Sequence, residues 1–409
     1  MLPLEGIRVL ALEQYYAGNV GSLVLARFGA EVIKIELPGA GDAMRNIGPQ
    51  VHNEAGERRN LSELRVMVGK KSVAVDMSKP EGREIILGLV EKCDVVWSNM
   101  KPSSLRKLGF TFETLKARRS DIIYTTLSGF GHDDLEPQGP FGDWVAFDII
   151  AQGLAGLQFR VESEVDEPRY NGLALGDQVT ALQAALGTVL ALYRRDREGG
   201  EQRVDVAMHD SMLFLNELSL ALTGFTGKPP TRGRSGTSAP YGAYKSADGF
   251  VNIAVGGTPV WRRFCVAMER TDLTDDTRFK EARGRVTNGP ELEAIVGAWT
   301  VQHTTAEIVR RLHGQGVPCA PVFTLPEVLN SPQIAPRNML YTIDDPIAGR
   351  QQVLGNPIKM SGVRDAPVGH APDLGEDSRS VLTELLGFDD ERITALAEAG
   401  VIATKASVE

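Results

Sequence analysis

The stretch VLALEQYYAGNVG, residues 9–21, decides the fold of this chain. An apolar run typical of a buried β-strand passes into a turn with glycines and then into small and apolar residues typical of a helix. A second β-rich run, EVIKIE at 31–36, follows and ends on an acid. This order is nearly that of a dinucleotide-binding unit, so a nicotinamide or flavin site is the first hypothesis to weigh.

The aromatic residues in this turn argue against that hypothesis. A dinucleotide-binding turn has the pattern G-x-G-x-x-G, whose first two glycines allow a tight turn and the close approach of a pyrophosphate. Here Gly18 and Gly21 supply G-x-x-G, but Tyr16 stands where the first glycine belongs and Tyr15 precedes it. Two bulky rings fill the space that a pyrophosphate needs. The sequence therefore disfavours a dinucleotide and predicts a helix packed closely on a sheet through its glycines.

The alternation of strand and helix continues through the first half of the chain. The β-rich runs occupy 7–12, 31–36, 72–76, 94–97, 121–127 and 202–207, and helix-like segments occupy 19–28, 80–92, 111–118 and 179–195. This alternation, with strands that are apolar on both faces, predicts an α/β fold whose parallel sheet is covered on both sides. The region 40–70 is poorer in apolar residues, and we expect it to form a long surface excursion.

The amino-acid composition of the sequence changes near residue 224. Residues 224–238 are rich in Gly, Pro, Arg, Ser and Thr, which is typical of a linker or mobile loop, and 241–255 alternates around an Ala-Asp-Gly turn as a β-hairpin does. At 409 residues the chain is long enough for two domains. We predict a smaller α+β domain at 225–325 and two helices, 378–386 and 390–399, in the tail.

Charge and cysteine content argue against several classes of function. The net charge of −9 disfavours binding to nucleic acid or to an anionic membrane through overall charge. The three cysteines are scattered and form no CxxC, so we predict no metal site and no disulfide framework, as fits a cytoplasmic protein. The N-terminus lacks a signal-peptide pattern, and the apolar run 181–193 is too short to span a bilayer, so we expect a buried helix there.

Several motifs taken together form a more specific pattern. In chain order they are LEGIRVL (4–10), FGAEVIKIE (28–36), PGAGD (38–42), KSVAVDM (71–77), DVVWSN (94–99), LRKLGF (105–110), LSGFG (127–131), GD (176–177), GEQRVDV (200–206), GVPCAPV (316–322) and APDLG (371–375). Over nearly the full chain this pattern resembles the family III CoA-transferases, also called the CaiB/BaiF family. That group includes formyl-CoA transferase and carnitine CoA-transferase, and the α-methylacyl-CoA racemases share its fold.

The resemblance implies an architecture and a class of ligand. It implies an open Rossmann-like large domain made of residues 1–224 and 326–409, with the small domain 225–325 inserted between them. It also implies an interlocked dimer, formed with an identical chain or as a heteromer with a related one. The near-Rossmann turn would then border an acyl-CoA site in place of a NAD site, with coenzyme A entering as part of the substrate and no permanently bound cofactor.

Asp177 has two interpretations. From the residues alone, an aspartate after Gly176 and before an apolar helix is most simply a helix N-cap. The resemblance instead implies that Asp177 is the nucleophile that attacks an acyl-CoA thioester. Carboxylate attack gives a mixed anhydride and then an aspartyl-CoA thioester, so one difficult exchange is divided into easier steps without ATP or a metal. We expect free amides at the helix N-terminus to stabilise charge near Asp177.

The racemase branch would need a second proton-transfer group. The resemblance implies a histidine shortly after the Ser-Gly-Phe-Gly motif as partner of the aspartate, and this chain has Phe147 at that position. A phenyl ring transfers no proton, so transfer of CoA is favoured over racemisation or epimerisation. His132 lies fifteen residues earlier, and we expect it to belong to a surface loop. A non-catalytic CoA-binding subunit of a heteromer is a further alternative, which the presence of Asp177 disfavours.

The resemblance also implies residues that contact coenzyme A and the acyl group. Those for coenzyme A are Val75 and Ser78 beside the adenine, Asn99 and Met100, and Arg106 or Lys107 at the phosphates. Tyr16 and Phe147 are expected in the substrate pocket. Formyl-CoA transferases carry a phosphate-contacting arginine where Leu37 stands, a glutamine where Tyr16 stands, and a glycine-rich loop for which Gly256-Gly257 is a weak substitute.

These departures favour a different acyl group from formyl or oxalyl. We expect a larger or dicarboxylic acid, with succinyl-CoA as a candidate donor and a free carboxylic acid as acceptor. Arg232 and Arg234 have two interpretations, as a binding site for the acceptor carboxylate or as part of a mobile basic loop.

Overall fold

The computed structural model describes residues 2–133, 135, 137, 139–142, 144–163, 165–363 and 369–405. The chain forms two compact units. The first contains residues 1–155, 172–215 and 334–409, and the second contains 156–171 and 216–333. The domain limits at 224/225 and 325/326 stay a prediction.

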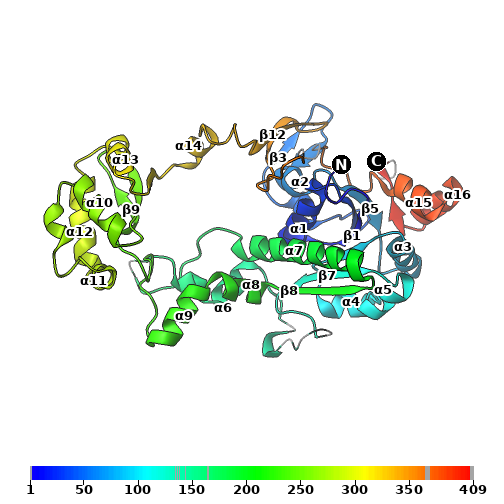
Figure 1. Ribbon diagram of the computed structural model, residues 1–409. Coiled ribbons are helices and arrows are strands. Elements are labelled where there is room, and N and C mark those ends of the chain that lie inside the picture. Colours follow the sequence, from blue (N-terminus) through cyan, green and yellow to red (C-terminus); the bar gives the residue numbers. More distant parts are fainter. Residues whose placement is uncertain are drawn as a thin grey trace. The chain divides into compact units, whose positions relative to one another are not determined.

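A seven-stranded sheet forms the centre of the first unit (Figure 1). Its order is β14 (Ile402–Ala403), β5 (Lys71–Val75), β2 (Glu31–Glu36), β1 (Arg8–Leu12), β6 (Val95–Ser98), β7 (Ile123–Ser128) and β8 (Gln202–Ala207). All neighbours pair in parallel except β14, which runs antiparallel to β5. Counted along the chain, the six parallel strands have the order 3-2-1-4-5-6 of doubly wound folds. The predicted α/β class with a largely parallel sheet is confirmed.

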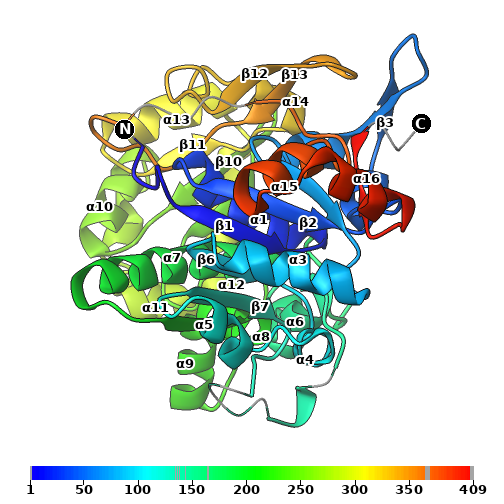
Figure 2. The same cartoon turned by 90° about the vertical axis from the view of Figure 1, so that its right-hand side faces the viewer.

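Helices cover both faces of this sheet because its central strands are apolar on both sides. On one side α1 (Tyr15–Arg27) and α7 (Leu175–Glu198) pack against Val9, Ala11 and Trp97. On the other side, which faces the viewer in Figure 2 with α3 and α15 in front of the sheet, Leu10 and Leu12 belong to a second core. The helices of that core are α3 (Pro80–Val90), α4 (Pro102–Leu108), α5 (Phe112–Arg118), α15 (Ser378–Leu386) and α16 (Asp390–Glu398). The two tail helices lie where the sequence predicted them.

The glycines of the opening turn allow α1 to approach the sheet closely. A Cβ atom on Gly21 would lie 2.2 Å from the Trp97 ring, and one on Gly18 would lie 2.7 Å from the Asn99 side chain. The Trp97 indole N–H donates to the Gly18 carbonyl at 3.0 Å. The glycines therefore serve helix–sheet packing, as the sequence predicted in place of a pyrophosphate site.

The expectation of a surface excursion at 40–70 is wrong for much of that region. It forms β3 (Gln50–His52), β4 (Arg58–Asn60) and α2 (Leu61–Val66), and Met44, Leu64 and 66–68 are buried against the hairpin of β12 (Leu340–Asp345) and β13 (Gly349–Leu354). Arg45 and Arg59 are also buried, because carboxylates neutralise them. Arg45 pairs with Glu36 and Glu63 at 2.7 and 2.8 Å, and Arg59 pairs with carboxylates at 3.0–3.4 Å.

The second unit combines a small sheet with short helices. Its three strands are β9 (Tyr241–Lys245), β10 (Phe250–Ala254) and β11 (Cys319–Pro321), all antiparallel. Its helices include α9 (Glu217–Thr226), α10 (Thr258–Ala267), α11 (Ala282–Thr287), α12 (Gly289–Thr300), α13 (Thr305–Gly314) and α14 (Leu325–Leu329). The predicted hairpin around 247–249 is confirmed. The hydrophobic core of the second unit includes the fully buried Trp261 and Phe264.

Within the described residues, α7 alone has the length and apolar composition that crossing a membrane requires. A core helix of a soluble protein meets the same criterion, and α7 packs against α1 and the sheet through its alanine-rich face. Its opposite face exposes Leu182, Leu186, Leu190 and Tyr193.

Replacing Gly21 with alanine should destabilise the first unit, because the new methyl group has no room beside the fully buried Trp97. Overpacking of this kind lowers the free energy of unfolding by about 1–3 kcal/mol. Gly297→Ala is the matched control, since nothing lies within 4 Å of its added Cβ in α12, and it should leave stability unchanged or raise it. Denaturant titration measures both, and equal stabilities of Gly21→Ala and wild type would contradict this account of the packing.

Candidate active site

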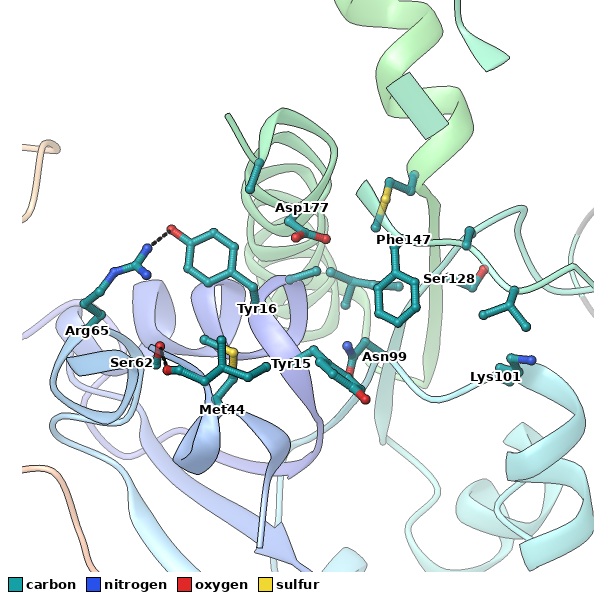
Figure 3. Close-up of a pocket in the computed structure, with 18 residues that line it drawn as sticks. Tyr15, Tyr16, Met44, Ser62, Arg65, Asn99, Lys101, Ser128, Phe147 and Asp177 are labelled. Carbon is teal, nitrogen blue, oxygen red and sulfur yellow. Dashed lines mark hydrogen bonds between the residues drawn. The ribbon is translucent and has the colours of Figure 1, made fainter. Parts of the chain in front are cut away.

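A cavity of about 570 Å³ lies in the first unit, where the strand order reverses between β1 and β6. Open parallel sheets bind ligands at the carboxyl ends of their strands at this point. Residues that follow β1, β6 and β7 line the cavity, together with the start of α7 (Figure 3). The cavity contains Asp177, Tyr16, Phe147 and Asn99, four of the residues that the sequence predicted for the site.

Tyr15 begins α1 in a left-handed backbone conformation, with φ of 58°. This conformation is costly for a residue with a bulky side chain. Asp42 stabilises it by accepting a hydrogen bond from the Tyr15 amide at 3.0 Å, and the Asn19 side chain donates to the Tyr15 carbonyl and to Asp42. The Tyr15 ring then meets the edge of Phe147, with centroids 5.6 Å apart. A bent turn held by polar groups thus sets one wall of the cavity.

Four buried charges lie beneath this turn. Lys34 pairs with Asp42 at 2.7 Å, and Lys70 pairs with Glu13 at 2.7 Å. Burial alone would lower the pKa of Lys34, but the charges of Glu13 and Asp42 outweigh it and raise that pKa. Burial lowers the pKa of Lys70 to about 8 in spite of Glu13. The Asp42 carboxylate that holds Tyr15 is therefore itself fixed by a buried cation.

Asn99 joins the two loops at the reversal of strand order. Its side-chain carbonyl accepts from the Gln14 amide at 2.9 Å, and its amide group donates to the Gln14 carbonyl at 2.6 Å. Both groups of the Asn99 side chain are thus engaged with the backbone that precedes Tyr15. Asn99 shapes the cavity wall whether or not it also contacts a ligand.

Asp177 lies in the first turn of α7 and is not the N-cap of that helix. The N-cap residue is Ala174, which provides no side-chain cap. Asp148 supplies that function from a distance in sequence, because its carboxylate accepts from the Gly176 amide at 2.6 Å and from the Asp177 amide at 3.4 Å. The N-cap interpretation of Asp177 is therefore wrong, and its carboxylate is left to line the cavity.

The expectation of free helix amides beside Asp177 is also wrong. Asp148 takes two of them, and the amides of Leu175 and Gln178 donate to the carbonyls of Leu173 and Ala174. Charge that develops near Asp177 must be stabilised by other groups.

Two effects raise the pKa of Asp177 to about 7. Burial is the larger, and the negative charge of Asp148 adds to it. The ordinary pKa of such a group is near 3.8. With the pKa raised to about 7, the protonated and ionised forms of this carboxyl group coexist near neutral pH. A carboxyl group with so strongly raised a pKa in a cavity is a candidate for covalent or acid–base chemistry.

Tyr16 lies between Arg65 and Asp177, and two side chains donate hydrogen bonds to its phenol (Figure 3). Its phenol oxygen accepts from the Arg65 guanidinium at 3.0 Å and from the Gln178 side chain at 3.2 Å. The same guanidinium stacks over the Tyr16 ring, 5.0 Å from its centroid. Asp148, Arg65, Gln178 and Lys101 were missed by sequence analysis, because no local motif marks any of them.

The other predicted coenzyme A contacts lie outside this cavity lining. Val75 is fully buried at the end of β5, Ser78 is exposed and bonded to Asp76, and Met100 is half-buried. Arg106 and Lys107 are exposed near the end of α4, and Arg106 pairs with Asp133 at 2.7 Å. The roles of these five residues in binding coenzyme A stay predictions.

His132 is buried, so its assignment to a surface loop is wrong. Its backbone amide donates to Asp205 at 2.8 Å, and it lines a separate, smaller cavity with Arg106. It is not among the residues that line the cavity with Asp177. Within the described part of the chain, no group of three or more His, Cys, Asp or Glu side chains is arranged to hold a metal ion.

Comparison with known proteins identifies relatives over nearly the whole chain. The sequence pattern that defines CoA-transferase family III matches residues 4–378. A succinyl-CoA:mesaconate CoA-transferase of Haloarcula hispanica is 36% identical over 384 residues, which are 93% of this chain and 96% of that protein. A succinyl-CoA–D-citramalate CoA-transferase of Chloroflexus aurantiacus is 32% identical over 98% of both chains. The crystal structure of a CaiB/BaiF family protein from Brucella suis superposes with a TM-score of 0.78 at 32% identity, covering 94% of this chain and 99% of the other.

Replacing Asp148 with asparagine should lower the pKa of Asp177 below about 7, because the variant removes a neighbouring negative charge and keeps an oxygen that accepts from the helix amides. Burial remains, so the pKa should stay above the ordinary value. A ¹³C NMR titration of the Asp177 carboxyl group measures this, with Asp177→Asn to assign the signal. A pKa that is unchanged or higher would contradict the proposed influence of Asp148.

Proposed function

This chain belongs to CoA-transferase family III, and we propose that it moves coenzyme A from a dicarboxylic acyl-CoA to a free carboxylic acid with Asp177 as nucleophile. The observation that supports this proposal is the Asp177 carboxylate in the cavity, with its pKa raised to about 7 by burial and by Asp148. Succinyl-CoA is the first candidate donor, because both named relatives act on it.

The reaction consists of four acyl exchanges. The Asp177 carboxylate attacks the thioester carbonyl, a C–O bond forms, the C–S bond breaks, and CoA thiolate leaves an acyl–aspartyl anhydride. The thiolate then attacks the Asp177 carbonyl and releases the donor acid, which gives an aspartyl-CoA thioester. The acceptor carboxylate attacks that thioester and expels CoA thiolate, which leaves an acceptor–aspartyl anhydride. The thiolate finally attacks the acceptor acyl carbon of this anhydride, which forms the new acyl-CoA and releases the Asp177 carboxylate. One thioester replaces another throughout.

The surroundings of Asp177 suit this sequence of steps. Burial makes its carboxylate poorly solvated, which strengthens it as a nucleophile once it is ionised. Tyr15, Phe147 and Met208 line the cavity with apolar surface, and exclusion of water protects an anhydride from hydrolysis. Lys101, also in the lining, is positioned to offset negative charge of the coenzyme.

Racemisation of an acyl-CoA is the alternative activity. It needs two groups that exchange an α-proton, and no histidine lines the cavity among the described residues. Phe147, at the position where racemases carry one, is a 54% exposed residue whose ring contacts the ring of Tyr15. These observations favour transfer.

We also propose that the protein is cytoplasmic. The residues that we propose to contact coenzyme A are Val75, Ser78, Asn99, Met100 and Arg106 or Lys107.

An interlocked dimer with an identical or related chain, in which the small domain is inserted between the parts of the large one, completes the proposal. The exposed apolar face of α7, formed by Leu182, Leu186, Val189, Leu190 and Tyr193, supports it. An exposed row of apolar side chains along one helix face is typical of an interface between chains.

The variant Asp177→Asn should lose at least about 1,000-fold in kcat, as expected for removal of a nucleophile, while it still binds acyl-CoA. Intact-protein mass spectrometry should detect a covalent aspartyl-CoA thioester on the wild type and none on the variant. Unchanged turnover by Asp177→Asn would refute the assigned role.

Transfer and racemisation differ in heavy water. With a panel of acyl-CoAs and carboxylic acids, transfer produces new acyl-CoA masses only when an acid is added, and these products contain no deuterium from the enzyme's action. Deuterium at the α-carbon without exchange of the acid would establish racemisation instead.

Disrupting the α7 face should separate the chains. The double variant Leu186→Glu with Leu190→Glu places two charges in the proposed interface, so its mass in solution should fall from a multiple of 44.3 kDa to that of one chain. Asp196→Lys, at an exposed polar position of the same helix, is the control. Light scattering after size-exclusion chromatography measures all three, and a single-chain mass for wild type would contradict the dimer.

A further inference from the structure

Arg65 differs from Arg45 and Arg59 of the same segment in having no acidic partner among the described residues. Arg45 and Arg59 are buried and neutralised by carboxylates. Arg65 extends from α2, is exposed and lines the cavity. Among the residues that the structure describes, no carboxylate lies within ion-pair distance of it, and its hydrogen bond is to the Tyr16 phenol. A cation aimed into a cavity without an internal counter-charge is available to a ligand.

Arg65 and Tyr16 together form a set of donors. A guanidinium carries five N–H groups and no acceptor, and one of them is used on Tyr16. The phenol oxygen accepts from both Arg65 and Gln178, so its own hydrogen is available to donate elsewhere. Several convergent donors beside a fixed positive charge fit a carboxylate better than a neutral group.

The position of this donor set relative to Asp177 indicates which part of a bound substrate it faces. Gln178, which donates to Tyr16, directly follows Asp177 on α7. In Figure 3 Tyr16 lies between Arg65 and Asp177, and Lys101 lies on the opposite side of Asp177, beyond Asn99. If coenzyme A occupies the side of Asn99 and Lys101, the acyl group bound at Asp177 extends toward Tyr16 and Arg65.

We propose that Arg65 and Tyr16 bind the distal carboxylate of a dicarboxylic acyl group and so select dicarboxylic over monocarboxylic acyl-CoAs. This inference rests on the proposed function and adds a residue-level basis for its substrate class. It also gives Tyr16 a role that a shorter side chain does not offer, since the phenol lies between the guanidinium and the nucleophile.

The test compares two thioesters of equal chain length, succinyl-CoA and butyryl-CoA, which differ in a terminal carboxylate or methyl group. Binding is measured by calorimetry in an Asp177→Asn background, so that no chemistry occurs, with Arg65 or with Arg65→Met. The ratio of the two affinities should favour succinyl-CoA with Arg65 and should fall about 10- to 100-fold in Arg65→Met, as expected for loss of hydrogen bonds to a charged group. Tyr16→Phe should lower the same ratio by a smaller factor, and Arg65→Lys should restore part of it.

Lys101→Met is the matched control. It removes a cavity cation at the proposed coenzyme A side, so it should weaken both thioesters by the same factor and leave their ratio unchanged. An Arg65→Met variant that behaves in this way, or that changes neither affinity, would overturn the inference and leave Arg65 as a support for the Tyr16 ring. Absence of turnover in the wild type with either thioester and any acid would instead refute the proposed function, and the binding ratio would still decide the role of Arg65.

Discussion

The hydrogen bond from the Tyr15 amide to Asp42 is the interaction on which the site depends. A left-handed tyrosine costs about 1–3 kcal/mol, so the turn keeps its shape only while its surroundings hold it. Asp42 does so from a fully buried position, where Lys34 balances its charge. The start of α1, the edge contact between Tyr15 and Phe147, and the placement of Tyr16 all follow from that one bent residue.

The polar groups beneath the turn hold a bend whose sequence departs from that of a dinucleotide-binding unit. In such a unit glycine makes the bend without strain and leaves room for a pyrophosphate. In this protein the bend is made with an aromatic residue and held by polar partners, and the room is filled by rings. The fold keeps the strand order of the dinucleotide-binding class, while its switch-point cavity presents a carboxylate, a guanidinium and apolar surface.

Periodicity predicted the parallel strands and their covering helices, because a strand that is buried on both faces has a nearly continuous apolar sequence. It failed at 40–70, where a charged composition suggests exposure but carboxylates neutralise the buried Arg45 and Arg59. One of these carboxylates, Asp345, is distant in the chain. Asp177 was assigned from a resemblance, but the cap of its helix was not predicted, since Asp148 reaches it from another segment. Arg65 and Lys101 gain significance only when the tertiary structure shows which charged side chains line the cavity.

The edge strand β14 and the two tail helices complete a core whose first residues are synthesised much earlier. Val381, Leu382, Phe388, Ile393 and Ile402 complete the apolar cluster that begins with Leu10 and Ile33. Ser72 beside them bonds to Asp377 and Gly375. The ribosome makes these residues after the whole of the second unit. A nascent chain therefore carries the open edge of β5, and the part of the sheet face that α15 and α16 later cover, while the second unit is synthesised. An open strand edge beside uncovered apolar surface is prone to aggregation during that period.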